Sequence, residues 1–356
     1  MTSKFSSRLP LLPTVSDILR TLRIKARKQL SQNFLLEHNL LHKIVHVAGV
    51  QSDSYVCEVG PGPGGITRAI LAKNPAQLDV IELDRRFLPG LELLAEASNG
   101  IVKVHQGDII KYALDDLWPR HIARDWYDAP PNASIVGNLP FQVSTRLIIL
   151  WLQAMSERSG AFSYGRVPLT LTFQDEVAKR IVSPLAHKHF RCRLSIMCQT
   201  YAEPEYAFMI PGRVFVPPPK VNAGVVKLIP RQTPLIPLHF KLVENFCNHL
   251  FHYRNKFSIK SAATLYPVDV AHELVHELFR KARVNPTFRC TQLSIEEIRD
   301  MCYVYEEQCN RIPGLFLFNY RKPKPLSELE KLPDCLPPQY LFAHEMHVQG
   351  SLSTIV

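Results

Sequence analysis

The chain has 356 residues, of which 46% are hydrophobic and 21% are charged, a composition typical of a globular protein with one large domain and a smaller one. Its formal net charge of +10 favours a polyanionic partner such as nucleic acid, although a need for solubility alone gives the same surplus. No apolar run reaches the roughly 18 residues that a membrane-spanning helix needs, which argues against a membrane protein.

Residues 1–27 form a basic N-terminal segment in which Asp17 is the single acid. Such an Arg-rich, acid-poor start resembles an organelle transit peptide. The competing interpretation is a basic helix, since apolar residues from Val15 to Ile24 recur at near-helical spacing after Pro13. Both interpretations can hold if cleavage takes place upstream of the helix.

Strand-like and helix-like runs alternate from about residue 55 onward. The predicted strands are 55–59, 78–83, 101–106, 133–138 and 167–174. The predicted helices between them are 64–73, 85–97 (interrupted by Pro89) and 145–155. This alternation predicts an α/β fold with a parallel sheet covered by helices on both faces. Two further predicted strands, 205–210 and 223–229, flank the proline-rich "VFVPPPKV" and suit a hairpin that closes the sheet edge.

The composition changes near residue 230, where "IPRQTPLIPL" resembles a linker. Three amphipathic helices are predicted beyond it, at 240–257, 269–282 and 293–309. We therefore expect a catalytic domain at 28–230, a small helical domain at 235–325 and a flexible tail at 326–356.

The eight cysteines are scattered, and none forms a CxxC pair or a cluster with zinc-ligand spacing. We expect reduced, mostly buried thiols in a reducing compartment and no metal site.

A glycine-rich turn, "EVGPGPGGIT", follows the first strand of the alternating region. Gly60, Gly62 and Gly65 match the short GxGxxG pattern of nucleotide-binding turns. Pro61 and Pro63 remove N–H donors, so this turn is a poor phosphate cradle and suits a nucleoside ligand without phosphates.

Two acids follow the next two strands. Glu82 ends the second strand, where a carboxylate can accept both ribose hydroxyls, and the alternative is a solvated strand-end acid. Asp108 follows the third strand and can accept from an adenine amine, although Gly-Asp also marks ordinary turns. The glycine turn and the two acids in this order resemble class I S-adenosylmethionine-dependent methyltransferases, which have a Rossmann-like fold.

The fourth strand ends in "GNLPF", at the sheet edge where ligands of this fold class bind. The side-chain oxygen of Asn138 and the Leu139 carbonyl can accept the two hydrogens of an adenine N6 amine and orient its lone pair. Pro140 stiffens the turn, and Phe141 offers a ring on which a base can stack. The alternative is an ordinary Asn turn with a packed Phe.

These segments, together with "KQLSQNFL", "TFQDEVAKR", "RLS" and "VFVPPPKV", resemble the rRNA adenine N6,N6-dimethyltransferase family over residues 13–325. The N-terminal motif and "GPGPGGITR" look most like its mitochondrial branch. The resemblance implies a Rossmann-like class I methyltransferase with a seven-stranded, mostly parallel sheet and a small C-terminal helical domain that binds rRNA.

The resemblance also implies a role for particular residues. Gly60 contacts the methionine end of S-adenosylmethionine, Glu82 the ribose and Asp108 the adenine amine. The implied cofactor-binding residues are Gln32, Asn33, Leu35, Gly60, Gly62, Glu82, Leu83, Asp108, Ile109 and Asn138. The implied acceptor-site residues are Asn138, Leu139, Pro140, Phe141 and Phe215, the last facing the target base from the other side. Lys220, Arg254 and Lys256 are candidate RNA contacts, but a solvated helix face explains Arg254 and Lys256 equally well.

The implied substrate is a pair of adjacent adenosines in the hairpin loop near the 3′ end of small-subunit rRNA, in the mitochondrial matrix. We expect a monomer that acts on the assembling small ribosomal subunit, without a membrane partner. One alternative is a non-catalytic transcription or ribosome-assembly factor that works with the mitochondrial transcription machinery. Another is a protein-amide methyltransferase, against which both Leu139 and the charge of +10 speak, because those enzymes place proline directly after Asn.

Overall fold

The described residues fall into two compact units. The computed structural model describes residues 14–15, 17, 20, 32–329 and 331. One unit combines the chain up to Val182 with Ala202–Gln232, and the other combines Ser183–Tyr201 with the chain from Thr233 onward. Most of the predicted N-terminal helix or transit peptide and nearly all of the predicted tail lie outside the described residues.

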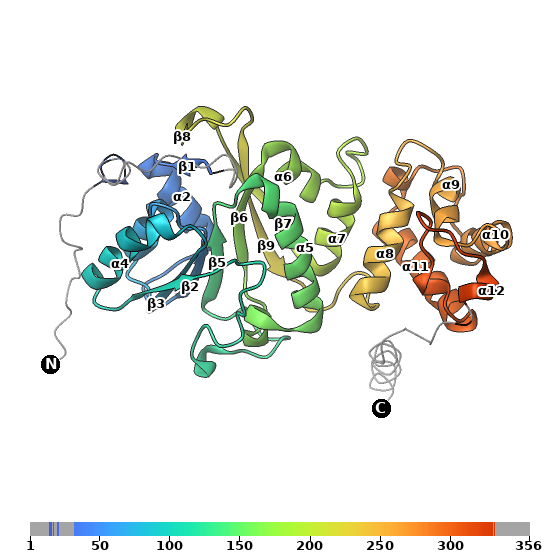
Figure 1. Ribbon diagram of the computed structural model, residues 1–356, viewed down its shortest axis with the longest axis horizontal. Helices are drawn as coiled ribbons and strands as arrows, with labels where there is room; N and C mark the ends of the chain where they lie inside the picture. Colours follow the sequence, from blue (N-terminus) through green and yellow to red (C-terminus); the bar gives the residue numbers. More distant parts are fainter. Residues whose placement is uncertain (1–13, 16, 18–19, 21–31, 330, 332–356) are drawn as a thin grey trace. The chain divides into compact units, whose positions relative to one another are not determined.

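The first unit is built on a seven-stranded sheet with the order β4-β3-β2-β5-β6-β9-β7 (Figure 1). Its strands are β2 (Tyr55–Val59), β3 (Gln77–Glu82), β4 (Val102–Gln106), β5 (Ala133–Gly137), β6 (Leu169–Gln174), β7 (Ala202–Ile210) and β9 (Ala223–Pro230). Pairs among the first five strands are parallel, whereas β9 runs antiparallel to both β6 and β7. The predicted mostly parallel sheet, with a hairpin at one edge, is confirmed.

The register of the parallel strands aligns their carboxyl ends. Val59 at the end of β2 lies opposite Ile81 of β3 and Gly137 of β5. Glu82 of β3 lies opposite Gln106 of β4. The residues that follow these four strands therefore meet at one edge of the sheet, where ligands of open α/β sheets bind.

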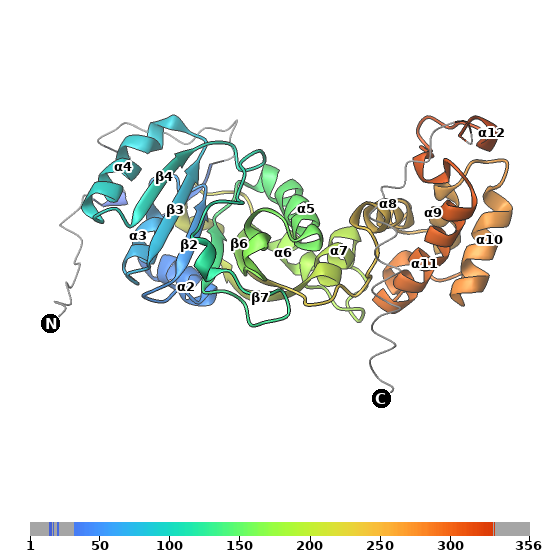
Figure 2. The same cartoon turned by 90° about the horizontal axis from the view of Figure 1, so that it is seen from below.

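Helices cover both faces of this sheet. They are α2 (His38–Ala48), α3 (Gly65–Leu71), α4 (Leu88–Ala97), α5 (Phe141–Glu157) and α6 (Asp175–Ile181), with short 3-10 turns η2 (Arg85–Phe87), η3 (Arg120–Ile122), η4 (Gly160–Tyr164) and η5 (Gly212–Val214). Apolar side chains of α2, α3 and α4 share one buried cluster with β2, β3 and β5. Figure 2 shows α5 on the opposite side of the sheet from α2.

Pro89 has a different effect from the predicted interruption of a helix. The segment forms η2 and then α4, with Pro89 in the first turn of α4. Proline is favoured there because the first N–H groups of a helix have no intrahelical acceptor and the ring presets a helical φ. The prediction of one interrupted helix over 85–97 was therefore wrong.

A two-stranded sheet joins parts of the chain that lie far apart in sequence. β1 (Phe34–Leu35) runs antiparallel to β8 (Phe215–Val216), with Leu35 opposite Phe215. Each strand has only two residues, so neither shows a periodicity that would predict the pair. The pairing joins the N-terminal motif to the segment that carries Phe215.

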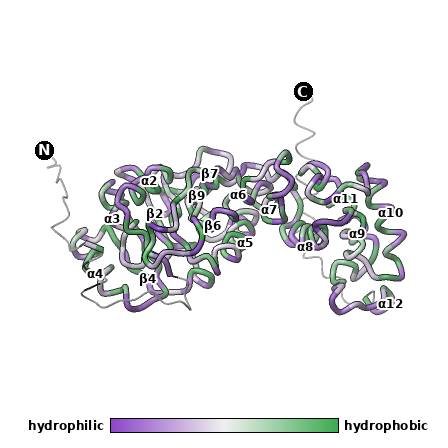
Figure 3. Tube along the Cα trace, turned by 90° about the horizontal axis from the view of Figure 1, so that it is seen from above, coloured by the Kyte–Doolittle hydropathy of each residue, from purple (hydrophilic) through white to green (hydrophobic). Residues whose placement is uncertain are grey.

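The second unit is helical. It contains α7 (Arg193–Tyr201), α8 (Phe240–Leu250), α9 (Ser258–Ala262), α10 (Ala271–Ala282), α11 (Ile295–Arg311) and α12 (Leu326–Leu329), with η6 (Ala263–Leu265), η7 (Cys290–Gln292) and η8 (Leu315–Leu317). The colouring of Figure 3 alternates between hydrophobic and hydrophilic along α8, α10 and α11, as predicted for amphipathic helices. The helix predicted over 240–257 ends at Leu250.

The helical unit also includes a segment that lies inside the predicted catalytic domain in sequence. Ser183–Tyr201 groups with this unit, which differs from a continuous domain at 28–230. The rings of Tyr201 in α7 and Phe240 in α8 lie 5.2 Å apart. Because α7 is buried along nearly its whole length, it lacks the polar stripe by which sequence assigns a helix to a surface.

The seven described cysteines are free thiols, and all but Cys192 are buried, which confirms that the described thiols are mostly buried. Among the described residues, no cluster of side chains could hold a metal ion. Within the same part of the chain, the helices are all too short or too polar to cross a membrane.

Candidate cofactor and base-binding site

Two adjoining pockets of the first unit meet at the carboxyl ends of the parallel strands. They share five lining residues, Gln32, Gly60, Glu82, Leu139 and Pro140, so they form one continuous cleft. Every predicted cofactor and acceptor residue lines one pocket or both.

The glycine turn lies at the floor of the first pocket. Gly62 has a φ of +54°, which favours glycine, and its N–H donates to the Glu82 carboxylate at 2.9 Å. A Cβ on Gly65 would lie 3.1 Å from the Leu35 carbonyl oxygen, so glycine lets β1 approach closely. The GxGxxG match therefore serves two local needs of this fold, a tight turn and a close backbone contact.

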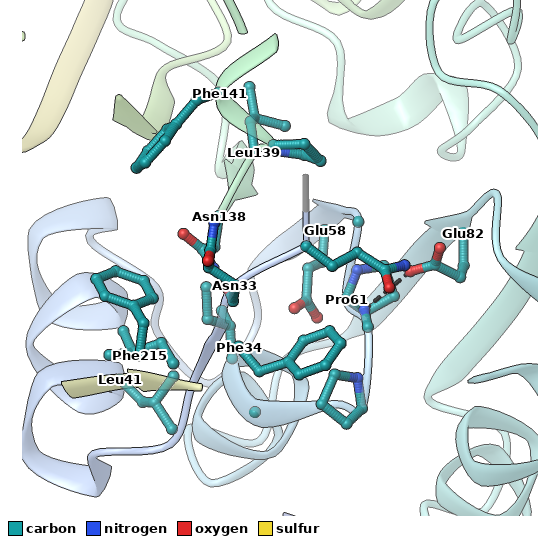
Figure 4. Close-up of a pocket in the computed structure, with 18 residues that line it drawn as sticks. Asn33, Phe34, Leu41, Glu58, Pro61, Glu82, Asn138, Leu139, Phe141 and Phe215 are labelled. Carbon is teal, nitrogen blue, oxygen red and sulfur yellow. Dashed lines mark hydrogen bonds between the residues drawn. The ribbon is translucent and has the colours of Figure 1, made fainter. Parts of the chain in front are cut away.

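Glu82 is buried, at 6% exposure, and both of its carboxylate oxygens accept backbone hydrogen bonds. One accepts from the Gly62 N–H (Figure 4) and the other from the Asp84 N–H at 2.7 Å. Burial raises the pKa of this carboxyl group. The alternative of a solvated strand-end acid was therefore wrong, and each oxygen retains a lone pair for a ligand.

Asp108 lines the second pocket together with Leu83 and Ile109. Its carboxylate accepts from the Ile110 N–H at 3.0 Å, and its carbonyl accepts from the Lys111 N–H at 2.8 Å. Asp108 thus forms the ordinary turn that sequence analysis offered as an alternative and lines the pocket as well.

The N-terminal segment is held against the end of β3 by side chains. The Gln32 amide donates to Asp84 at 2.9 Å, and Arg86 donates to the Gln32 side-chain oxygen at 3.3 Å. Hydrogen bonds from Arg86 lower the pKa of Asp84 to about 2. Gln32, Asn33 and Leu35 line the first pocket, and their role in covering a cofactor stays a prediction.

Asn138 follows β5 and its amide group is held at both ends. The side-chain nitrogen donates to the Asn33 carbonyl at 3.2 Å, and the Thr172 hydroxyl donates to the side-chain oxygen at 2.7 Å. An amide oxygen has two lone pairs, so one is left for a further donor. Thr172, a buried residue of β6, is a positioning residue that sequence analysis missed, because alternation alone assigns it only to a face of the sheet.

Leu139 is buried, and Pro140 immediately precedes α5, which begins at Phe141. Figure 4 shows Phe141 and Phe215 to one side of Asn138, while Glu58 and Glu82, together with the ring of Phe34, lie to the other. Phe215 is 2% exposed and comes from β8. Asn138 therefore lies between Phe141 and Phe215 on one side and the two buried acids on the other.

Glu58 is a second acid of the first pocket, and sequence analysis did not single it out. It is 1% exposed and accepts a hydrogen bond from the Thr67 hydroxyl at 2.6 Å. Burial raises its pKa to about 8. An acid inside the apolar run "YVCEV" was the signal that could have found it, because buried unpaired carboxylates are rare outside functional sites.

The three candidate RNA contacts do not line either pocket of the cleft. Lys220 is exposed in the segment between β8 and β9. In the helical unit, Arg254 donates to the His189 carbonyl, so it stabilises a loop of that unit. Lys256 is exposed.

The chain matches known proteins along most of its length. Residues 23–307 match the family described as ribosomal RNA adenine dimethylase. The chain is 47% identical over 323 residues to a Xenopus laevis protein named "Dimethyladenosine transferase 1, mitochondrial", with 91% of this chain and 94% of the relative covered. A Homo sapiens protein of the same name is 45% identical over 315 residues, with 88% and 91% covered.

Two solved structures share the fold. A dimethyladenosine transferase from Plasmodium falciparum has a TM-score of 0.61 at 20% identity, covering 77% of this chain and 98% of that one. The 23S rRNA methyltransferase ErmE has a TM-score of 0.53 at 21% identity, covering 77% and 100%. These similarities confirm the predicted Rossmann-like methyltransferase fold with C-terminal helices. The family match and the close relatives together show that the chain belongs to the ribosomal RNA adenine dimethylase family, whose members are S-adenosylmethionine-dependent methyltransferases.

Proposed function

We propose that this rRNA adenine N6,N6-dimethyltransferase modifies two adjacent adenosines in the hairpin loop near the 3′ end of mitochondrial small-subunit rRNA. Each adenosine receives two methyl groups while the small ribosomal subunit is assembled. The observation that carries the proposal is the held amide of Asn138, which lies between two aromatic rings, Phe141 and Phe215, and two buried acids.

The residues of the cleft fit S-adenosylmethionine by their chemistry. Glu82 retains lone pairs for the ribose hydroxyls, and Asp108 offers a carboxylate to the adenine amine. Gly60, beside Glu58 and Leu35, suits the methionine end. When bound, the cofactor supplies an electrophilic methyl group. The protein's own contribution is positioning and electrostatics.

The acceptor nitrogen is a poor nucleophile, because its lone pair is delocalised into the adenine ring. Asn138 and the Leu139 carbonyl accept its two hydrogens, which favours a pyramidal nitrogen with its lone pair free to attack. Thr172 and Asn33 keep the Asn138 oxygen in place without rearrangement at the moment of reaction. The methylated amine is acidic enough to lose its proton to water, so no buried general base is needed.

The target base must leave its stack to reach Asn138, as base-modifying enzymes require. Phe141 and Phe215 line the same side of the pocket and offer rings for the base. Stacking on an aromatic side chain contributes roughly 1–3 kcal/mol per base, which offsets part of the cost of unstacking.

The helical unit, in which Ser183–Tyr201 joins the chain from Thr233 onward, is proposed to bind rRNA. The net charge of +10 supports phosphate contacts, and we assign Lys256 of the helical unit and Lys220 of the first unit to them. Arg254 is a weaker candidate, because its guanidinium already donates to the His189 carbonyl.

The relatives named above carry mitochondrial names, and we extend that location, the matrix, to this chain. The protein is proposed to act there as a monomer. Complementation with a methylation-dead variant distinguishes rRNA methylation from a second role with the mitochondrial transcription machinery. If such a variant restores every phenotype, the essential role is the non-catalytic one.

The direct test is incubation with labelled S-adenosylmethionine and mitochondrial small-subunit rRNA, followed by mapping of the modified positions. We expect two neighbouring N6,N6-dimethyladenosines in the 3′-terminal hairpin loop. Label at a distant adenosine would contradict the assigned substrate, and label in protein would contradict the reaction.

A further inference from the structure

The loop that follows β4 is attached to the sheet through one buried carboxylate. Asp79 lies in β3 and is 1% exposed. Its neighbours Leu78 and Val80 point into the cluster shared with α2, α3 and α4, so Asp79 points to the other face of the sheet. A charged residue within a strand is costly unless its oxygens are satisfied, and both oxygens of Asp79 accept hydrogen bonds.

The first oxygen begins a chain of side chains. The Asp79 carboxylate lies 2.8 Å from His105 Nε2, and His105 Nδ1 lies 2.9 Å from the Tyr112 hydroxyl. A carboxylate can only accept, so Nε2 carries the hydrogen. In the neutral imidazole Nδ1 then accepts, and the Tyr112 hydroxyl donates to it. The direction of both bonds is thus set by Asp79.

The second oxygen reaches the same loop further along. It accepts from the Gln77 side-chain amide at 2.8 Å, and that amide also donates to the Leu117 carbonyl at 3.1 Å. Asp79 therefore restrains the loop at Tyr112 and at Leu117.

The ring of Tyr112 lies against the turn that lines the second pocket. A Cβ added to Gly107 would lie 2.8 Å from Cδ2 of Tyr112, so ring and backbone are in close contact. The Gly107 N–H donates to the Glu82 carbonyl at 3.0 Å. Gly107 is thus held between β3 and the tyrosine ring, and the next residue is Asp108.

We propose that Asp79, His105 and Tyr112 are positioning residues that hold the Gly107–Ile110 turn in the shape that recognises the adenine of the cofactor. The proposal rests on the adenine role of Asp108 proposed above. Among the described residues, the hydrogen bonds to Asp108 come from the Ile110 and Lys111 N–H groups beside it in the chain, so the position of the whole turn depends on what holds Gly107. The hydrogen bonds among Asp79, His105 and Tyr112 reach no acceptor-site residue. We therefore expect these three residues to affect cofactor recognition and not methyl transfer.

The test compares two ligands that differ at the purine 6-position and, as a consequence, at N1, which accepts a hydrogen bond in adenine and donates one in hypoxanthine. S-adenosylhomocysteine carries an amine at the 6-position, and S-inosylhomocysteine carries an oxygen there. The variant Tyr112→Phe keeps the ring against Gly107 and removes the hydroxyl. Dissociation constants are measured by titration calorimetry, and kcat is measured at saturating S-adenosylmethionine. A matched control is Tyr206→Phe, which removes a hydroxyl that donates to Asp175 at 2.5 Å, outside both pockets.

We expect Tyr112→Phe to reduce the ratio of the two affinities, adenosyl ligand over inosyl ligand, by about 2- to 13-fold, the range that loss of one neutral hydrogen bond gives. The change should come from weaker binding of the adenosyl ligand, while kcat stays within about twofold. In an Asp79→Asn background the Tyr112 substitution should have little further effect, since the two act through one chain. Tyr206→Phe should leave the preference unchanged.

The variant Asp108→Asn, measured for its affinity for the adenosyl over the inosyl ligand, tests the proposed adenine role of Asp108 separately from the positioning inference. If Tyr112→Phe keeps the wild-type preference, the positioning inference is wrong, whatever Asp108→Asn does. If Tyr112→Phe narrows the preference and Asp108→Asn does not, the turn is positioned as inferred but another of its residues reads the adenine. An equal narrowing in Tyr206→Phe would also overturn the inference, because the effect would then follow from any lost hydroxyl.

Discussion

The hydrogen bond from Thr172 to Asn138 allows the positioning role of Asn138 to be tested without touching Asn138 itself. The hydroxyl of Thr172 is buried, at 0% exposure, and lies 2.7 Å from the Asn138 side-chain oxygen. Thr172→Val keeps the shape of the side chain and removes this donor. The Asn138 amide then keeps only its bond to the Asn33 carbonyl, so its oxygen can rotate away from the acceptor nitrogen.

The magnitude follows from the worth of one hydrogen bond. A neutral bond contributes about 0.5–1.5 kcal/mol net, and its full loss in the transition state slows methyl transfer by about 2- to 13-fold. The dissociation constant of S-adenosylhomocysteine should stay within about twofold, since Thr172 lines neither pocket. The assay is single-turnover methylation of a small-subunit rRNA fragment at saturating cofactor, with calorimetry for the ligand.

Thr170 provides a matched control on the same strand. It faces the same side of β6, is buried, and its hydroxyl has no hydrogen-bond partner among the described residues. Thr170→Val should leave the rate unchanged and should raise the free energy of unfolding by about 1 kcal/mol, because it removes an unsatisfied buried hydroxyl. Wild-type methylation by Thr172→Val, or an equal loss in Thr170→Val, would refute the positioning role of Thr172.

Three further predictions concern the cleft. Glu58→Gln should flatten the pH dependence of stability in urea unfolding at about pH 6 and about pH 8. The carboxyl of Glu58 has a pKa of about 8 in the folded protein, above its unfolded value of 4.5. Its contribution to stability is therefore complete below about pH 4.5 and is lost as pH rises toward 8, by up to about 1.4 kcal/mol per pH unit. Parallel pH–stability curves for variant and wild type would contradict this. Gly65→Ala should weaken S-adenosylhomocysteine binding about tenfold, because the new Cβ would lie 3.1 Å from the Leu35 carbonyl oxygen and displace β1. An unchanged affinity in calorimetry would show that β1 does not cover the ligand. Phe141→Ala should raise the KM for rRNA about tenfold or more while leaving S-adenosylhomocysteine affinity unchanged, and an unaltered KM would rule out stacking on Phe141.

The sheet and the order of the site were predictable because short-range patterns carry them. Apolar runs ended by Gly60, Glu82 and Asn138 mark parallel strands, and strands of one sheet place their carboxyl ends at a common edge. The family motifs then assign these positions to one cleft. The structure confirms that the predicted residues line it.

Contacts between distant segments were not predictable in the same way. The pairing of β1 with β8 involves two residues on each side, which is too short for a periodic signal. Thr172 and Asp79 lie within strands, where alternation gives a face but not a hydrogen-bond partner. The segment Ser183–Tyr201 carries no composition change that would separate it from the catalytic domain, because its helix α7 is buried almost throughout.

The measurement that tests the central claim most directly is methylation of mitochondrial small-subunit rRNA by Asn138→Ala, with S-adenosylhomocysteine affinity measured on the same preparation. The wild type should produce two adjacent N6,N6-dimethyladenosines. Asn138→Ala should produce none, while the ligand still binds with a measurable affinity, because Glu82 and Asp108 remain in place. Undiminished dimethylation by Asn138→Ala would contradict the account of how the acceptor amine is oriented.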